Sequence, residues 1–334
     1  RTGAAYQEVS RPFSVEIKKE YSAVQREGGS MVKTKKKAGL LQELKESIPA
    51  YILILPTIAI LIIFLFIPFA NAFRISLYKY KGYGELRNFV GLDNYVKVLQ
   101  DEQFYRAFGN TFKLIACDLL FSITIGFILA YILFKGIRLK RFFNTALFIP
   151  YLISMVVIGC IWRIIYDPTI GPLNQILEMI GLGNLAQPWL SQVGTALPAI
   201  IVTWIWRTIP FNMLICYANI MTLPKDQLEA AEMDGASQLQ RLRYIIIPHM
   251  IPTFVTLGIL TVTNDLRAFD MVWVMTQGGP GGASDVLTSY GYSNAFQSQK
   301  FGPATAASII MMVVMIGITI LLQVVKKAGG KNNE

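Results

Sequence analysis

Residues 47–73 read SIPAYILILPTIAILIIFLFIPFANAF, a stretch without a single Asp, Glu, Lys or Arg. At a rise of about 1.5 Å per residue, roughly 20 such residues cross a hydrocarbon layer about 30 Å thick, so the stretch can span a membrane as a helix. A cleaved signal peptide has a shorter apolar region and a small-residue cleavage site, which is not found here. The stretch therefore predicts a membrane-spanning helix.

Five further apolar runs follow in a chain of 334 residues that is 53% hydrophobic and only 16% charged. This composition lies outside the range of ordinary soluble domains. Together the runs predict an all-α polytopic membrane protein with six transmembrane helices. The six-span domain covers residues 47–325, between a tail at 1–46 and a short C-terminal tail at 326–334. The further spans are expected at 112–134, 142–165, 196–220, 250–275 and 302–325.

The basic residues indicate which way the chain crosses the membrane. The two tails and the segments 135–141 and 221–249 hold 20 of the 31 lysines and arginines, against 9 on the other side. Cytoplasmic loops carry an excess of Lys and Arg, so both termini are expected in the cytoplasm, although the basic segment 74–113 argues the other way. Met31 is a candidate translation start, in which case residues 1–30 are not native.

Several function classes are disfavoured by composition and motifs. The net charge of +10 comes from short basic clusters beside apolar runs, which orient a chain in a membrane and form no face for nucleic acid. Cys117, Cys160 and Cys216 lie inside apolar runs, and His249 is the single histidine, so neither a disulfide framework nor a metal site is expected. No G-x-x-x-x-G-K-[ST] phosphate-binding loop occurs, so any energy must come from a partner or from a gradient.

The polar stretch 221–249 between the fourth and fifth spans predicts two short helices on the cytoplasmic side. Leu223–Pro224 can begin the first helix, because a proline at the first helical position loses no backbone hydrogen bond. Gly235 can adopt the left-handed turn that ends this helix, and Pro248 is expected to stop the second helix at the membrane edge. Leu239, Leu242 and Ile246 are expected on the apolar side of the second helix.

This stretch resembles the EAA loop of the membrane subunits of binding-protein-dependent ABC importers, E-A-A-x-x-D-G-A followed nine residues on by I-x-L-P. The matching segments are Glu229–Ala231, Asp234–Ala236 and Ile245–Pro248. Ile247 replaces the usual Leu, and Leu242 stands where Phe is frequent; both changes keep an apolar side chain.

Other segments are similar to the carbohydrate branch of this family, which serves oligosaccharides and glycerol-3-phosphate. Phe269–Asp270 and Thr276–Pro280 match its F-D-x-x-x-x-x-T-x-G-G-P segment. Val90–Tyr95 and Asn110–Thr111 extend the likeness over about residues 50–325.

The resemblance implies a maltose-permease-like fold in a prokaryotic cytoplasmic membrane, and a transport subunit rather than an enzyme. It implies a second permease chain, usually a different one, two ATP-binding subunits that carry the ATP and Mg, an extracytoplasmic solute-binding protein and a sugar substrate. The implied ATPase-coupling residues are Glu229, Ala230, Ala231, Asp234, Gly235, Ala236 and Pro248. The resemblance also implies a loop that faces the solute-binding protein, with Gly278, Gly279 and Pro280. A flexible loop without any partner has the same composition.

A charged side chain at the centre of a membrane-spanning helix costs roughly 2.5–3.5 kcal/mol of insertion free energy. Each charged or strongly polar residue inside a span is therefore a candidate for function. Helical spacing places Thr261 and Asp265 on one face, while Arg267 and Asp270 at i, i+3 are expected to form an ion pair. Asp118 is expected to bond to a neighbouring helix. In related sugar permeases the ligand contacts lie on the fourth and fifth spans, although each side chain could equally serve helix packing. The substrate-pathway candidates are Trp206, Thr208, Phe211, Asn212, Thr261, Asn264 and Asp265.

Two other functions remain open from the residues alone. A gradient-driven secondary transporter would use Asp118, Asp265 or Asp270 as a proton or ion site. A membrane insertase or assembly factor would need no ligand specificity. The identity of the sugar, and whether the permease chains form a heterodimer or a homodimer, also remain open.

Overall fold

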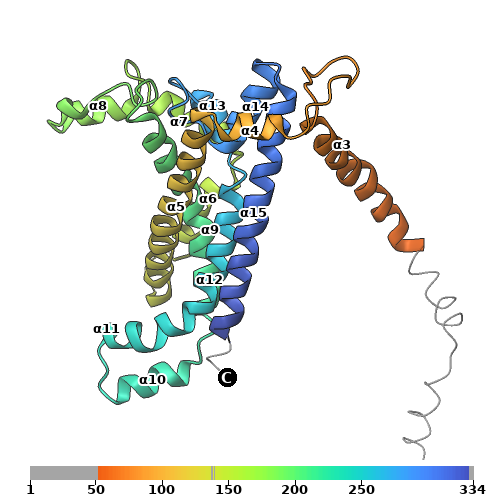
Figure 1. The fold of residues 1–334 in the computed structure, drawn as a ribbon. Coiled ribbons are helices and arrows are strands. Elements are labelled where there is room, and N and C mark those ends of the chain that lie inside the picture. The colour runs from red at the N-terminus through yellow and green to blue at the C-terminus, as the bar shows by residue number, and fades with distance from the viewer. Residues whose placement is uncertain (1–51, 137, 139, 331–334) are drawn as a thin grey trace, which may run out of the picture. The chain divides into compact units, whose positions relative to one another are not determined.

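The computed structural model describes residues 52–136, 138 and 140–330, and the tail 1–46 with Met31 lies outside them. These residues are mainly helical (Figure 1), and the described residues contain no strand, only one isolated bridge between Tyr78 and Phe89. The helices are α3 (Ile67–Ser76), α4 (Asp93–Leu99), α5 (Glu102–Lys135), α6 (Lys140–Leu152), α7 (Met155–Ile165), α8 (Pro172–Met179), α9 (Ala196–Ile220), α10 (Lys225–Met233), α11 (Gln238–Arg241), α12 (Ile247–Asp265), α13 (Asp270–Thr276), α14 (Leu287–Tyr292) and α15 (Phe301–Gly330).

The first span runs over Ile52–Ser76 and contains the π-helical turn η2 (Ile62–Phe66). Of the described residues, 52–70 belong to one unit and those from Asn71 onward belong to another. Within the most apolar window of this span no residue is buried. Its apolar side chains therefore need lipid or another chain as their surroundings.

Residues from Asn71 onward pack around α5 and α9, which cross closely at Gly126. A Cβ added at Gly126 would lie 2.9 Å from the Asn212 Cβ atom and the Met213 backbone nitrogen, so only glycine allows this approach. Trp204, Met213 and Met250 are among the buried side chains of the two largest apolar clusters. Such close helix packing, rather than a hydrophobic driving force, holds helices together in lipid.

Five helices in the described residues are long and apolar enough to cross a membrane, and a bent pair raises the number to six. The prediction of an all-α polytopic membrane protein is confirmed. The bent pair is Phe142–Leu152 with Met155–Ile165, which meet at 97°. Pro150 inside α6 lacks a backbone donor, and Ser154 before α7 is extended at ψ 141°, so the third span is broken rather than straight.

The boundaries of two other spans differ from the sequence prediction. The second span begins at Glu102 rather than near 112, because Asp101 caps it by accepting a 2.9 Å bond from the Gln103 backbone nitrogen. The fifth apolar helix ends at Asp265, and residues 270–276 form the separate helix α13.

The expected Arg267–Asp270 ion pair is wrong, because the helix ends before it could bring the two side chains together. Asp270 begins a new helix, and the Arg267 Nε donates instead to the Thr263 carbonyl at 3.2 Å. Among the described residues the ion pairs lie elsewhere.

Within the part from Asn71 onward, opposite ends carry different elements (Figure 1). Helices α10 and α11 lie at one end, together with the C-terminal end of α15. Helices α4, α13 and α14 lie at the other. The EAA-like segment and the GGPGG loop, residues 278–282, are therefore on opposite sides of the helical bundle.

Candidate functional site

The EAA-like segment forms two short helices joined by a tight turn. Pro224 precedes α10 as its N-cap, and Gly235 follows α10 with φ +78°, which confirms the predicted left-handed turn. Ser237 then begins α11 through a capping box: its backbone nitrogen donates to the Gln240 Oε1 at 2.7 Å, and its hydroxyl accepts from the Gln240 backbone nitrogen at 3.3 Å. These local bonds fix the angle between the helices.

Side-chain contacts tie the two helices to each other and to the bundle. Arg241 on α11 pairs with Glu232 on α10 at 2.7 Å. Gln238 accepts a 2.6 Å hydrogen bond from Lys135, the last residue of α5. Leu228 and Leu242 pack against an apolar cluster that includes the buried Ile246. The segment is therefore a compact projection that can transmit force as one body.

Two predictions for this segment are wrong. Pro248 does not stop a helix; a π-helical turn, η4 (Leu242–Ile246), leads directly into α12, and Pro248 lies in the first turn of α12, where its missing donor costs little. Leu239 is 72% exposed rather than packed, because Leu242 and Ile246 already form the buried face of this short helix.

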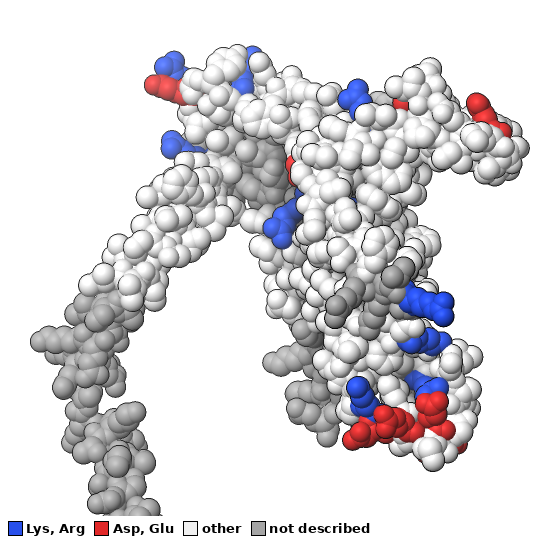
Figure 2. Space-filling view, turned by 180° about the vertical axis from the view of Figure 1, so that it is seen from behind, with Lys and Arg blue, Asp and Glu red and all other residues white. Residues whose placement is uncertain are grey.

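The outer surface of the segment combines acidic and apolar groups. Figure 2 shows acidic side chains gathered at the α10–α11 end. In the same segment Met233, Leu239 and Tyr244 are 88%, 72% and 70% exposed. A cleft of about 310 Å³ opens beside Gly235 and Tyr244. The segment therefore presents apolar and acidic groups together at its surface. The acidic residues of the segment are Asp226, Glu229, Glu232 and Asp234; Ala230 and Ala231 lie between them, and Ala236 follows the Gly235 turn.

Three spans meet at a cluster of buried polar groups inside the bundle. Thr208 on α9 donates to the Asp118 Oδ1 on α5 at 2.6 Å, and the Trp204 Nε1 donates to the Asp265 Oδ1 on α12 at 2.9 Å. Asn212 donates to the Ser122 hydroxyl at 2.7 Å. The prediction that Asp118 bonds to a neighbouring helix is confirmed.

Two carboxyl groups are buried in this cluster. Asp118 and Asp265 are each 1% exposed, and their Oδ2 atoms have no hydrogen-bond partner among the described residues. Polar groups inside a span are costly unless a neighbouring helix supplies partners, as α9 does for both Oδ1 atoms. The cluster therefore ties α5, α9 and α12 together with bonds that lipid cannot replace.

The remaining pathway candidates lie apart from this cluster. Phe211 stacks on Tyr151 of α6 with ring centres 5.1 Å apart, and the Arg207 guanidinium lies 5.1 Å from the same Tyr151 ring. The buried Arg207 Nε has no partner among the described residues. Sequence reasoning missed Tyr151, although Pro150 beside it marks a break in the span. Thr261 is buried and Asn264 is exposed.

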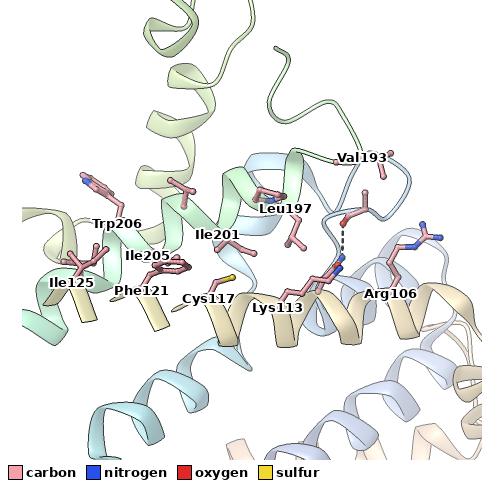
Figure 3. Close-up of a pocket in the computed structure, with 16 residues that line it drawn as sticks. Arg106, Lys113, Cys117, Phe121, Ile125, Val193, Leu197, Ile201, Ile205 and Trp206 are labelled. Carbon is pink, nitrogen blue, oxygen red and sulfur yellow. Dashed lines mark hydrogen bonds between the residues drawn. The ribbon is translucent and has the colours of Figure 1, made fainter. Parts of the chain in front are cut away.

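Trp206 lies on another face of α9, in a groove of about 1030 Å³ between α5 and α9 (Figure 3). Arg106 and Lys113 stand near one end of this groove, and Trp206 and Ile125 near the other. Most of its lining is apolar, whereas a carbohydrate needs many convergent hydrogen-bonding groups. The groove thus lacks the polar character of a sugar site.

The glycine-rich loop is firmly built. Gly278 is buried at φ +82°, and a Cβ there would lie 2.0 Å from the Asp285 Oδ1, so no larger residue fits. Ser284 donates to the Gly279 carbonyl at 2.6 Å, with Pro280 half-buried beside it. Burial raises the pKa of the Asp285 carboxyl, against the hydrogen bond from Ser289 and the charge of Arg106.

The Asn110–Thr111 pair fastens this loop region to α5. Asn110 donates to the carbonyls of Ala283 and Asp285, both at 2.9 Å, and the Thr111 hydroxyl accepts from the Leu287 backbone nitrogen at 3.0 Å. The pair therefore positions the GGPGG loop at the end of the bundle opposite to α10 and α11.

Comparison with known proteins places these features in a transport family. Residues 122–328 match the family model described as binding-protein-dependent transport system inner membrane component. The chain is 31% identical to the probable ABC transporter permease protein YurN of Bacillus subtilis, covering 84% of this chain and 96% of YurN. It is 29% identical to the trehalose/maltose transport system permease protein MalF of Thermococcus litoralis, covering 83% and 93%.

Solved structures agree. A chain from the crystal structure of a bacterial ABC transporter involved in the import of the acidic polysaccharide alginate superposes with a TM-score of 0.77. The identity is 26%, covering 86% of this chain and 98% of that one. These likenesses give no support to a gradient-driven secondary transporter.

Proposed function

We infer that this chain, which belongs to the family of binding-protein-dependent transport system inner membrane components, carries a sugar or sugar derivative across the membrane. It is a multi-pass permease subunit of an ABC importer and not an enzyme. The substrate class follows from the trehalose/maltose and alginate systems to which the chain is similar.

The observation that carries the mechanism is the compact projection formed by α10 and α11. ATP and Mg would bind to two separate ATP-binding subunits, and the projection would seat in a cleft of one of them. The Gly235 turn, the Ser237 capping box and the Arg241–Glu232 pair make it rigid enough to transmit their motion. Glu229, which is exposed on α10, would meet a basic group of that subunit.

Orientation follows from this docking. The ATP-binding subunits work in the cytoplasm, so the α10–α11 end and the C-terminal end of α15 would lie there. The excess of basic residues on this side supports the same direction. The loop with Gly278, Gly279 and Pro280 would then face an extracytoplasmic solute-binding protein.

A second permease chain would complete the pathway. The first span has no buried residue in its most apolar window, which is consistent with a partner helix or lipid around it. Six spans from one chain supply one wall of a passage, and two such chains enclose it.

The sugar contacts are assigned to the face of α9 that meets α6. Tyr151 and Phe211 offer an aromatic surface. Arg207 adds a cationic group that suits a hydroxyl, carboxylate or phosphate, and its Nε has no hydrogen-bond partner among the described residues. Thr208, Asn212 and Asp265 would hold the helices that carry this face, because each is already hydrogen-bonded inside the bundle. Trp206, Thr261 and Asn264 remain further candidates along the route.

A charge reversal at Glu229 tests the coupling. Glu229→Lys should abolish co-purification of the ATP-binding subunits and ATP-driven sugar uptake into vesicles, while the permease still inserts and melts as the wild type does. Glu178→Lys is the matched control, because Glu178 is equally exposed on α8 at the other end. Uptake without ATP-binding subunits, or equal losses in both variants, would show that the proposal is wrong.

A further inference from the structure

A basic cavity lies at the end of the bundle opposite to α10 and α11, away from the proposed coupling and sugar surfaces. It measures about 590 Å³, and its lining includes Lys79, Lys81, Lys97 and Lys300. Asp101 is its single acidic lining residue. Both Asp101 oxygens are occupied: Oδ2 accepts from the Tyr290 hydroxyl at 2.6 Å, and Oδ1 from the Gln103 backbone nitrogen at 2.9 Å.

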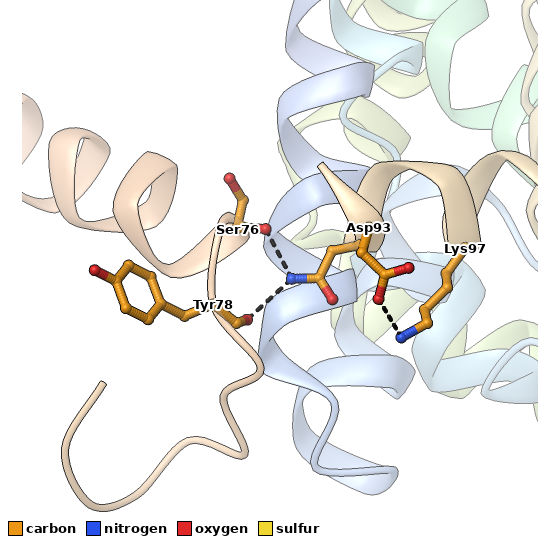
Figure 4. A network of polar contacts seen from close by, with 5 residues as sticks. Ser76, Tyr78, Asp93 and Lys97 are labelled. Carbon is orange, nitrogen blue, oxygen red and sulfur yellow. Dashed lines mark hydrogen bonds and ion pairs between the residues drawn. The ribbon is translucent and has the colours of Figure 1, made fainter. Parts of the chain in front are cut away.

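Three of the four lysines are available for a ligand. Lys97 pairs with Asp93 at 2.6 Å (Figure 4). Lys79, Lys81 and Lys300 have exposed side chains and make no ion pair with any described residue. Three uncompensated ammonium groups around one cavity repel each other, and an anion between them would remove that repulsion.

The walls of this cavity are held by hydrogen bonds. Asn94 donates to the carbonyls of Ser76 and Tyr78 at 2.8 and 2.9 Å, which fastens α4 to the end of α3 (Figure 4). Gly302 donates its backbone nitrogen to the Tyr80 carbonyl at 3.2 Å. A Cβ on Gly302 would lie 2.4 Å from the Tyr78 carbonyl oxygen, so the segment that carries Lys79 and Lys81 is clamped against the start of α15.

The lysines lie just outside two candidate membrane spans along the chain. The first span ends at Ser76, and the last span begins at Phe301. Lys79 and Lys81 therefore follow one span closely, and Lys300 immediately precedes another. Basic side chains just outside a span lie at the membrane surface, where anionic phosphates are concentrated.

Helix α4 adds an apolar surface beside the charges. Leu92, Val96 and Leu99 are 67%, 48% and 48% exposed, although α4 also carries Lys97. These three residues recur at i, i+4 and i+7 and so share one face, which can lie against acyl chains beside the lysines of the cavity. The acidic surface of a soluble receptor would use the lysines but leave these three side chains in water.

We propose that this cavity binds the headgroup phosphate of an anionic phospholipid, with its acyl chains against α4. The site accounts for basic residues on the side of the membrane where the charge rule does not expect them. It does not depend on ATP coupling, so it can fail or hold independently of the proposed function.

The test measures lipid retention by the purified transporter. Membranes of phosphatidylglycerol and phosphatidylcholine are the two probes, and native mass spectrometry counts the bound lipid. The triple variant Lys79→Gln, Lys81→Gln, Lys300→Gln should bind phosphatidylglycerol roughly a hundredfold more weakly, since each lysine near an anionic surface contributes about fivefold. Lys→Arg at the same three positions should keep the binding.

A control with the same loss of charge, Arg87→Gln, Lys113→Gln, Arg163→Gln, should retain phosphatidylglycerol as the wild type does. Competition by glycerol phosphate or inorganic phosphate separates recognition of the phosphate alone from recognition of the whole lipid; displacement at equal concentrations would overturn the lipid assignment. Equal retention of phosphatidylcholine would also overturn it. A triple variant that keeps the lipid but loses affinity for the solute-binding protein would likewise overturn the lipid assignment. That result would identify an acidic receptor surface as the ligand of the cavity.

Discussion

Replacement of Gly235 by Ala isolates the backbone of the turn from every side-chain contact. Gly235 has φ +78°, and a Cβ added there would meet no atom within 4 Å. The variant therefore causes no clash, and its cost is the left-handed conformation itself, about 1–2 kcal/mol for an L-residue. Because 1.4 kcal/mol corresponds to about a factor of ten, the equilibrium for forming the turn falls about five- to thirtyfold.

If docking requires this turn, the apparent dissociation constant for the ATP-binding subunits rises by up to the same factor. The assay is binding of these subunits to the purified permease, together with sugar-stimulated ATP hydrolysis in liposomes. Gly235→Asn should lie between wild type and Gly235→Ala, because Asn tolerates left-handed backbone better than Ala does.

The matched control is Gly181→Ala, since Gly181 follows α8 with the same φ of +78° and equally open surroundings. It bears the same backbone cost at a place without a proposed partner, so ATP hydrolysis should be unchanged. Equal losses in Gly181→Ala and Gly235→Ala, or full coupling in Gly235→Ala, would show that the shape of this turn does not transmit the motion.

Three other predictions concern stability, each read as the melting temperature in detergent. Gly126→Ala should destabilise the protein by about 1–3 kcal/mol, because the added Cβ would press on α9. Gly109→Ala, on the same helix, places a Cβ with no atom within 4 Å and should be neutral or stabilising. A loss of stability in both variants would contradict the close crossing of α5 and α9. Thr208→Val removes the donor to Asp118 and should cost about 0.6–2 kcal/mol, while Thr319→Val, which loses only a bond to its own helix, should cost less. Burial raises the pKa of Asp285, so its contribution to stability is present below the unfolded-state pKa and is lost as pH rises through the folded-state pKa. Asp285→Asn should flatten this dependence of the melting temperature on pH. An unchanged pH profile in the variant would contradict the role of Asp285.

The fold class could be read from hydrophobic length, because a run such as residues 47–73 has only one stable state in lipid. The residues at which spans begin and end are harder to predict from the sequence. The start of α5 depends on capping by Asp101, and the end of α12 on a break at residues 266–269 that composition does not mark. The same break removed the expected Arg267–Asp270 pair, since helical spacing applies only within one helix.

The candidate site was predictable where its geometry is local. Gly235 and the residues around it form their turn through bonds to near neighbours, so the motif and the structure agree. Tyr151, by contrast, gains its importance from Phe211 and Arg207 on another span, and no pattern along the chain records that meeting.

The helical character, the repeated membrane crossings and the EAA-like segment are readable from the order of the amino acids alone, because each depends on the hydrophobicity or backbone freedom of consecutive residues. The bonds from α9 to Asp118 and Asp265, and the meeting of Lys79, Lys81 and Lys300 at one cavity, emerge only in the folded chain. Burial and charge proximity depend on distances between helices, and those distances are set by packing across the whole bundle.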